Sequence, residues 1–72
     1  MAAKKIYLGP KLRQLRQAAG QTQLEMAKAL GLSASYVNLL ENNQRSLSVQ
    51  VLMRVSEVYG VEWRDLVKDD AP

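Results

Sequence analysis

Apolar residues recur with helical spacing along most of the chain. In the first such stretch, Leu8, Leu12, Leu15 and Ala19 stand at positions i, i+4, i+7 and i+11, which places them on one face of a helix. Similar stripes follow, separated by short polar or glycine-containing segments. In the fourth stretch, the residues expected to be buried are Val51, Leu52, Val55, Val58 and Tyr59. The pattern predicts an all-α fold with five helices, at about residues 10–19, 23–30, 34–42, 49–59 and 62–68.

Residues that start and stop helices flank these stretches. Thr22 followed by Glu25 is the pattern of a capping box, in which each side chain accepts a hydrogen bond from the backbone N–H of the other. Ser33 and Ser48 are the expected N-caps of the third and fourth helices. Residues suited to a positive φ follow four of the predicted helices: Gly20, Gly31, Asn43 and Gly60.

The segment 22–45 has the outline of a helix-turn-helix. The turn 31–33 is so short that the two helices must cross at a steep angle and at close range. Ala27 supplies the small side chain expected at the crossing, and Val37 and Leu40 form the buried stripe of the second helix. This arrangement predicts sequence-specific binding of double-stranded DNA.

The opposite face of helix 34–42 carries short or uncharged side chains, namely Ala34, Ser35, Asn38 and Leu39. Such a surface is expected where a helix enters a DNA groove and touches base edges. We therefore expect these four residues to read the bases. The alternative is an ordinary solvated helix face, although such faces usually carry lysine and glutamate.

Length and composition argue against an enzyme. The 72 residues allow one domain with a small core, too little for a deep catalytic cleft as well. The chain has no cysteine and no histidine, and so lacks thiolate metal ligands and the commonest general base. We expect neither a cofactor nor a metal. The carboxylates Asp65, Asp69 and Asp70 lack the rigid loop of a metal site and indicate a solvated acidic end.

No apolar run approaches the roughly 20 residues that span a bilayer, and the start of the chain does not resemble a secretory signal. We expect a soluble protein with no membrane partner, located in the bacterial cytoplasm and associated with the nucleoid. The predicted organisation is a flexible N-terminal arm at 1–8, a DNA-binding domain at 9–68, and a tail or linker stub at 69–72.

Charge is distributed unevenly along the chain. Residues 1–45 contain seven basic and two acidic residues, a net charge of +5, whereas residues 46–72 contain three basic and five acidic residues, a net charge of -2. The N-terminal part is therefore suited to face phosphates, and the C-terminal part would be repelled by them. Small soluble domains are often unevenly charged, so charge alone does not decide between nucleic-acid binding and other functions.

The sequence LRQLRQAAGQTQLEMAKALGLSASYVNLLENNQR followed by VLMRVSEVYGVEW resembles the DNA-binding domain of the Cro/cI-type (XRE) repressor family. The resemblance extends from Gly9 to Leu66 and implies a five-helix, lambda-repressor-like fold. The segment SASYVNLLENNQR also resembles the N-terminal domain of bacterial regulators that respond to short-chain acyl-CoA or fatty-acid metabolism. That similarity implies a longer parent protein with a C-terminal sensing domain.

The resemblance also implies roles for individual residues. It places Ala34, Ser35, Asn38 and Leu39 on the base-facing positions of the recognition helix. The positions that grip the DNA backbone in the family are occupied by Gln23, Tyr36, Asn43, Gln44 and Arg45. For two of these there is a structural alternative, because Tyr36 can belong to the core with its hydroxyl at the rim and Arg45 can balance the C-terminal end of its helix.

The same resemblance also bears on four residues: Arg16, Glu41, Gln21 and Ala34. The resemblance suggests an ion pair between Arg16 and Glu41 that braces the first helix against the third, a structural role. Gln21 departs from the pattern, because the family usually has an apolar residue there, which weakens the expected packing onto Met26. Ala34 also departs from it by replacing a frequent polar residue, so we expect more contribution from thymine-methyl contacts and from DNA shape.

The interpretation is a transcriptional regulator, of the repressor type, that binds operator DNA. One such module buries only about 600 to 1,000 Å² on DNA, so we expect a homodimer on an inverted repeat with half-sites about 34 Å apart. The alternative is a protein-interaction module of the antitoxin or anti-repressor type that keeps the fold. The basic N-terminal half and the polar loop 42–45 argue against that alternative.

Overall fold

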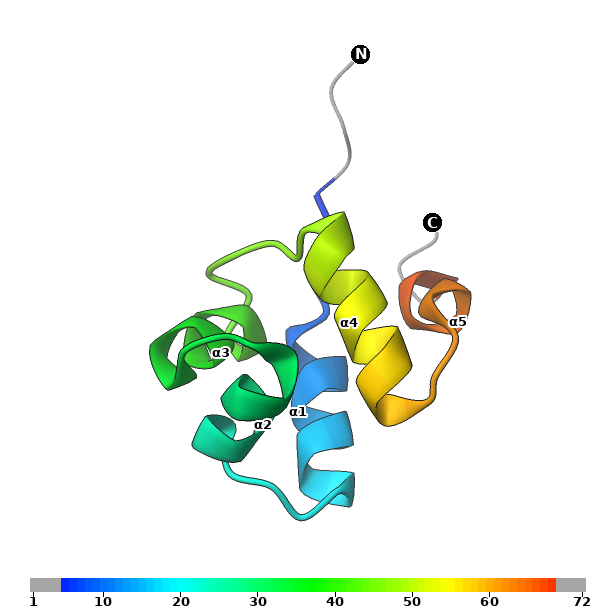
Figure 1. Ribbon diagram of the computed structural model, residues 1–72. Helices are drawn as coiled ribbons and strands as arrows, with labels where there is room; N and C mark the ends of the chain where they lie inside the picture. The colour runs from blue at the N-terminus through cyan, green and yellow to red at the C-terminus, as the bar shows by residue number, and fades with distance from the viewer. Residues whose placement is uncertain (1–4, 69–72) are drawn as a thin grey trace.

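Five helices form the part of the chain that the structure describes, residues 5–68 of this computed structural model (Figure 1). They are α1 (Gly9–Ala18), α2 (Gln23–Leu30), α3 (Ala34–Glu41), α4 (Val49–Tyr59) and α5 (Trp63–Lys68). The predicted all-α class is confirmed, and each predicted helix end lies within one residue of the observed end. Residues 1–4 of the predicted arm and the predicted tail at 69–72 lie outside the described residues.

The expected caps fix the helix boundaries. Thr22 Oγ1 accepts from Glu25 N at 3.1 Å, and Glu25 Oε1 accepts from Thr22 N at 2.8 Å, so the capping box is complete. Ser33 and Ser48 each accept a hydrogen bond from the backbone N–H three residues later. Asn43, two positions after the last residue of α3, takes a positive φ of 58°, which is uncommon for a residue other than glycine.

The turn between α2 and α3 brings these helices into close contact. Gly31 ends α2 with φ 72°, and Leu32 N donates to Ala27 O at 2.8 Å. Ala27 is fully buried, as expected for a small residue at the crossing. Figure 1 shows α2 and α3 on one side of the molecule, with α5 on the far side of α4. The helix-turn-helix is therefore a packed unit at one end of the domain.

A single core lies between the helices. Its buried members come from every helix and from the flanking segments: Leu8, Leu12, Met26, Ala27, Leu30, Val37, Leu40, Leu47, Leu52, Val55 and Leu66. Two residues of the predicted stripes are instead exposed. Ala19 follows the last helical residue of α1, where the chain turns away, and Val58 lies at the edge of the α4 face because a helix turns about 100° per residue.

The segment before α1 is attached to the rest of the domain. Leu47 N donates to Ile6 O at 2.8 Å, and the two residues form an isolated antiparallel bridge. Leu8 is buried, whereas Tyr7 is exposed. These contacts tether the start of α1 to the loop between α3 and α4. Within residues 5–68, each helix is too short or too polar to cross a membrane.

Candidate nucleic-acid interface

The outward face of α3 gathers the four residues predicted to read bases. Ser35 and Asn38 are exposed, and Ala34 and Leu39 are half-buried. None of the four is buried, whereas Val37, Leu40 and Glu41 of the same helix are. The helix thus presents hydroxyl, amide and aliphatic groups, which can donate or accept hydrogen bonds and cover a thymine methyl group.

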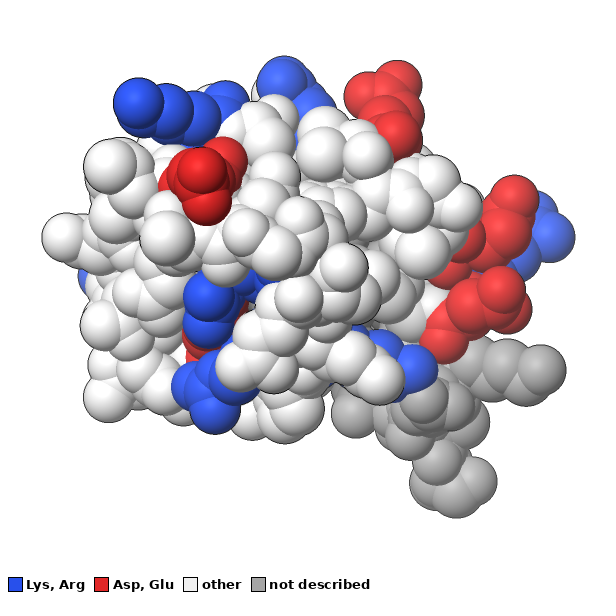
Figure 2. Space-filling model, turned by 90° about the horizontal axis from the view of Figure 1, so that it is seen from below, with Lys and Arg blue, Asp and Glu red and all other residues white. Residues whose placement is uncertain are grey.

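The charged residues are distributed so that acidic groups lie mainly at the other end of the domain. Figure 2 shows most of the red side chains on the side that carries α5, whereas the side that carries α2 and α3 is largely white. The acidic residues of α4, α5 and their connection are Glu57, Glu62 and Asp65, all exposed. A polyanion approaching α3 would therefore meet little repulsion.

The loop after α3 contains three of the residues predicted to contact the DNA backbone. Gln44 and Arg45 are exposed. Asn43 has an internal contact as well, since its Oδ1 accepts from Gly9 N at 2.9 Å. Gly9 is required at this point, because a Cβ built on it would lie 2.3 Å from Glu41 O and 2.6 Å from Asn43 Oδ1. The loop is thereby held against the start of α1.

Tyr36 has the core contact that was given as its structural alternative. Its side chain is half-buried and packs against the core cluster. It is also the residue whose backbone N–H is capped by Ser33 Oγ at 3.1 Å, so it lies in the first turn of α3. The aromatic ring therefore helps to seat the N-terminal end of α3.

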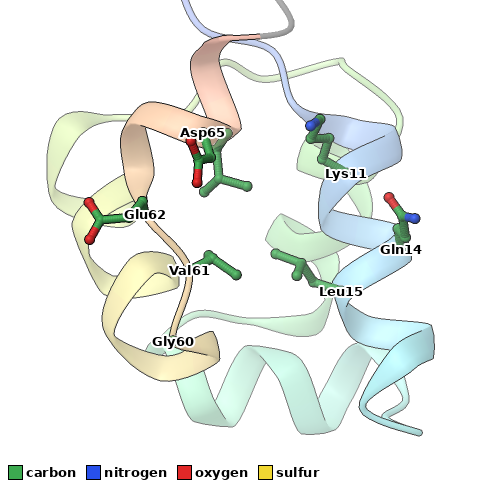
Figure 3. A pocket seen from close by; sticks show the side chains of 8 residues that line it. Lys11, Gln14, Leu15, Gly60, Val61, Glu62 and Asp65 are labelled. Carbon is green, nitrogen blue, oxygen red and sulfur yellow. The ribbon is translucent and has the colours of Figure 1, made fainter.

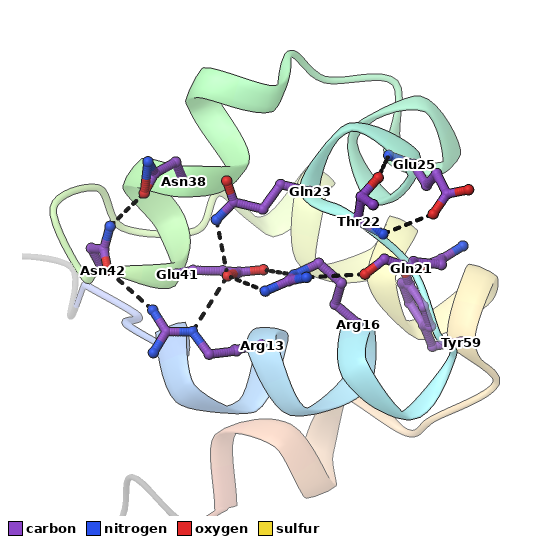
Figure 4. A network of polar contacts seen from close by, with 10 residues as sticks. All are labelled: Arg13, Arg16, Gln21, Thr22, Gln23, Glu25, Asn38, Glu41, Asn42 and Tyr59. Carbon is purple, nitrogen blue, oxygen red and sulfur yellow. Dashed lines mark hydrogen bonds and ion pairs between the residues drawn. The ribbon is translucent and has the colours of Figure 1, made fainter.

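Glu41, the last residue of α3, is the centre of a polar network that joins α3 to α1 and α2, drawn in Figure 4. Its side chain has no exposed surface, yet it lies 2.7 Å from Arg16 Nε through Oε2 and 3.5 Å from Arg13 Nε through Oε1. Arg16 also donates through Nη2 to Glu41 Oε1 at 3.3 Å and through Nη1 to Gln21 O at 3.0 Å. The structure thus brings the predicted pair Arg16 and Glu41 into direct contact between α1 and α3.

Burial and pairing act in opposite directions on Glu41. Burial alone would raise the pKa of its carboxyl group, but hydrogen bonds from Arg16, Gln23 and Arg13 and the charge of Arg16 lower the pKa below its ordinary value. The hydrogen bond to Glu41 likewise raises the pKa of Arg16. The pair is therefore ionised at neutral pH.

Gln23 takes part in this network, although the sequence suggested only a contact with phosphate. Its Nε2 donates to Glu41 Oε1 at 3.2 Å. Gln23 is the first residue of α2 and Glu41 the last residue of α3, so the bond links the ends of the helix-turn-helix. At least one amide N–H of Gln23 is thus used inside the protein.

Arg13 and Asn42 extend the network toward Asn38, although neither was among the predicted site residues. Arg13 donates through Nη2 to Asn42 Oδ1 at 3.1 Å, and Asn42 Nδ2 donates to Asn38 Oδ1. The sequence contained a signal for each, because Arg13 precedes Arg16 by three positions and Asn42 follows Asn38 by four, spacings that place side chains together on a helix surface. Arg13 and Asn42 therefore connect the buried carboxylate to the base-facing surface.

The unusual polar residue Gln21 also has a partner. Tyr59 donates through its hydroxyl to Gln21 Oε1 at 2.6 Å. Burial is the main cause that raises the pKa of Tyr59, so its hydroxyl stays protonated and acts as the donor. Gln21 thus ties the α1–α2 turn to the end of α4 by a hydrogen bond.

A groove of about 420 Å³ lies elsewhere, between α1 and α5 (Figure 3). Its lining comes from α1, α5 and the α4–α5 connection: Lys11, Gln14, Leu15, Gly60, Val61, Glu62, Asp65 and Leu66. It includes no residue of α2 or α3. Among the described residues, no group of three or more acidic side chains is placed to hold a metal ion.

Comparison with known proteins identifies the family. Residues 12–66 match the helix-turn-helix family model HTH_3. The chain is 55% identical over 51 residues to the HTH-type transcriptional regulator PrpR of Mycobacterium tuberculosis, covering 71% of this chain and 10% of PrpR. It is 41% identical over 69 residues to the propionyl-CoA carboxylase regulator of Cereibacter sphaeroides, covering 96% of this chain and 15% of that protein. The chain thus spans a small part of the length of both relatives.

A solved structure agrees with these relatives. The restriction-modification controller protein C.AhdI from Aeromonas hydrophila superposes with a TM-score of 0.75 at 34% sequence identity, over 85% of this chain and 92% of that one. The fold of this chain is therefore shared with that controller protein. The chain belongs to the XRE-type helix-turn-helix family of transcriptional regulators.

Proposed function

We propose that this domain binds specific double-stranded operator DNA, with α3 as the recognition helix in the major groove. The observation that supports the proposal is the outward face of α3, where Ala34, Ser35, Asn38 and Leu39 stand clear of the core and carry no charge. An α-helix fits the width of the major groove, and these side chains can contact base edges without binding phosphates indiscriminately.

Residues flanking α3 supply contacts with the DNA backbone in this proposal. Gln44 and Arg45 are exposed in the loop that follows the helix. Arg45 contributes a fixed positive charge, and Gln44 contributes amide donors. Tyr36, Gln23 and Asn43 have internal contacts and act mainly by positioning α3 and its loop. Phosphate contacts fix the register on the duplex, whereas base contacts provide the sequence preference.

The active species is a homodimer on an inverted repeat, acting in transcriptional regulation in the bacterial cytoplasm. A single module buries about 600 to 1,000 Å², which limits its affinity for one half-site. Two modules related by a twofold axis would place their α3 helices about 34 Å apart along one face of the duplex. A longer parent protein with a sensing domain is part of the proposal, supported by the 10% and 15% of PrpR and the propionyl-CoA carboxylase regulator that the chain spans.

Selection from a random pool of duplex DNA, followed by a salt titration on the selected sequence, tests this function. The expected product is an inverted repeat, bound with an affinity that falls steeply as salt rises, because binding releases counterions from the phosphates. If no sequence is enriched and no duplex binds in a salt-dependent way, DNA binding is refuted. The protein-interaction alternative would then be the better explanation of the fold.

A further inference from the structure

The side-chain amide of Asn38 is held in one orientation by a chain of hydrogen bonds that begins at the buried carboxylate of Glu41. Arg13 lies against Glu41 through Nε and donates to Asn42 Oδ1 through Nη2 at 3.1 Å. Asn42 Nδ2 then donates to Asn38 Oδ1. Figure 4 shows the same path, with the nitrogen of Asn38 turned away from Asn42.

The chemistry of the three groups allows this arrangement and opposes the reverse one. A guanidinium has donors and no acceptor, so Asn42 must turn its oxygen toward Arg13. The nitrogen of Asn42 then faces Asn38, which must accept with its own oxygen. If either amide rotated by 180°, two donors would face each other without an acceptor.

The orientation has a consequence for base recognition. A bidentate contact between asparagine and adenine needs the amide oxygen to accept from adenine N6 while the nitrogen donates to N7. In this structure the oxygen of Asn38 accepts from Asn42, and the nitrogen of this exposed residue is turned away from Asn42. With its oxygen engaged by Asn42 and its donor turned outward, the amide is best matched by guanine, which presents two acceptors, N7 and O6, in the major groove.

We propose that Arg13 and Asn42 are positioning residues that fix the Asn38 amide with its nitrogen outward, so that the domain selects guanine over adenine at the base pair Asn38 contacts. This inference rests on the proposed function, because it needs α3 to lie in the major groove. On DNA the surface of α3 loses water, and an amide turned the wrong way leaves donors unpaired. The hydrogen bonds from Arg13 through Asn42 thereby link the buried carboxylate of Glu41 to the base that Asn38 selects.

The Asn42→Asp variant reverses the direction of the hydrogen bond between residues 42 and 38 and provides the sharpest test. A carboxylate at position 42 still accepts from Arg13 but cannot donate to Asn38, so the amide of Asn38 must turn its nitrogen inward and its oxygen outward. Gln44→Glu is the matched control, because it adds the same charge in the neighbouring loop and leaves the hydrogen-bond chain intact. Both variants should bind all DNA more weakly through charge repulsion.

Base preference separates the two variants. Sequences are selected from a random duplex pool with the wild type and with each variant, and the guanine-to-adenine affinity ratio is measured at the position that depends on Asn38. The wild type and Gln44→Glu should favour guanine by about tenfold, the value of one well-placed contact. Asn42→Asp should reduce that ratio to about one or invert it. In an Asn38→Ala background, the Asn42→Asp and Gln44→Glu profiles should coincide.

The outcomes that overturn the proposal are distinct from a failure of the proposed function. If the wild type binds DNA but Asn42→Asp and Gln44→Glu share one profile, or if the wild type prefers adenine at that position, the positioning role is wrong and DNA binding stands. If the wild type binds no duplex, both are wrong. Should Asn42→Asp fail to fold in a thermal melt, Asn42→Ala replaces it, because removing the donor without adding charge should also bring the ratio toward one.

Discussion

Gln23 Nε2 donates a hydrogen bond to Glu41 Oε1 at 3.2 Å, which joins the first residue of α2 to the last residue of α3. The same carboxylate pairs with Arg16 and Arg13 of α1. A single buried carboxylate therefore connects three helices, and the position of α3 relative to the rest of the domain depends on it. The stability of the fold and the orientation of α3, the proposed recognition helix, are thus linked through one side chain.

A double-mutant cycle measures the main pair of this network. Glu41→Met leaves Arg16 without its carboxylate, and Arg16→Met leaves a buried carboxylate with only Arg13 and Gln23 as partners. Breaking a buried pair costs about 3 to 5 kcal/mol, and Arg16→Met should lie at the lower end because those two partners remain. The double variant should lose less than the sum of the single losses. Additive losses in urea denaturation would mean that the two residues do not interact.

The same carboxylate makes stability depend on pH. The pKa of Glu41 is lowered in the folded protein, so its stabilising contribution is complete above the ordinary glutamate value of 4.5 and is lost as the pH falls through the folded-state pKa. The stability advantage of the wild type over Glu41→Gln should therefore shrink below pH 4.5. Urea denaturation at several pH values measures this, with the exposed Glu57→Gln as the control for loss of one carboxyl group. An advantage that grows as the pH falls would contradict the sign.

The helices and their ends could be predicted from sequence because local signals decide them. Thr22, Ser33 and Ser48 each cap a helix through a backbone N–H only three residues away, so the information lies within one turn. The positive φ of Asn43 is a local property of the same kind. Periodicity then assigns the core face, and it failed at Val58, where a stripe wider than the buried face includes its edge.

The network around Glu41 was only partly predictable. The contact of Arg16 with Glu41 joins residues 25 positions apart, and family resemblance rather than local pattern suggested it. The contact of Gln23 with the same carboxylate joins residues 18 positions apart and depends on how α2 and α3 are packed. Local spacing cannot tell whether an exposed amide at a helix start faces a phosphate or a neighbouring side chain. The path from Arg13 through Asn42 to Asn38 requires the same three-dimensional information.

Gly9→Ala tests the close approach of α1 to the end of α3. The added Cβ would lie 2.3 Å from Glu41 O, a backbone atom that moves only if the helix end shifts. We expect a loss of about 3 kcal/mol in the free energy of unfolding, at the upper end for an overpacked site. Gly20→Ala is the comparison, because its Cβ meets no atom within 4 Å and only its positive φ opposes the change. A smaller loss for Gly9→Ala than for Gly20→Ala would mean that the contact is relieved easily.

Arg45→Ala tests the proposed grip on the DNA backbone. Phosphate contacts carry charge and no sequence information, so the variant should bind all duplexes more weakly by a similar factor. The salt dependence should become shallower by about one unit in the log-log slope. Arg64→Ala removes the same charge from α5, where Arg64 lies 5.6 Å from the Trp63 ring centroid, and should leave the slope unchanged. A loss confined to one sequence, with an unchanged slope for Arg45→Ala, would assign Arg45 to base readout instead.

The prediction on which the function depends concerns the outward face of α3. Ser35, Asn38 and Leu39 lie outside the core, so truncating any of them to alanine should leave the fold and the non-specific affinity nearly intact. In the major groove, Ser35 can donate or accept, Asn38 can donate, and Leu39 can cover a thymine methyl group, with each good contact worth about 1 to 3 kcal/mol of discrimination. Each variant should therefore relax the preference at one particular base pair. Competition binding against operators with single base-pair changes measures this, with Gln14→Ala on the exposed side of α1 as the control. If all three variants keep the parent preference profile, α3 is not the recognition element, and the exposed polar face must serve a partner other than DNA.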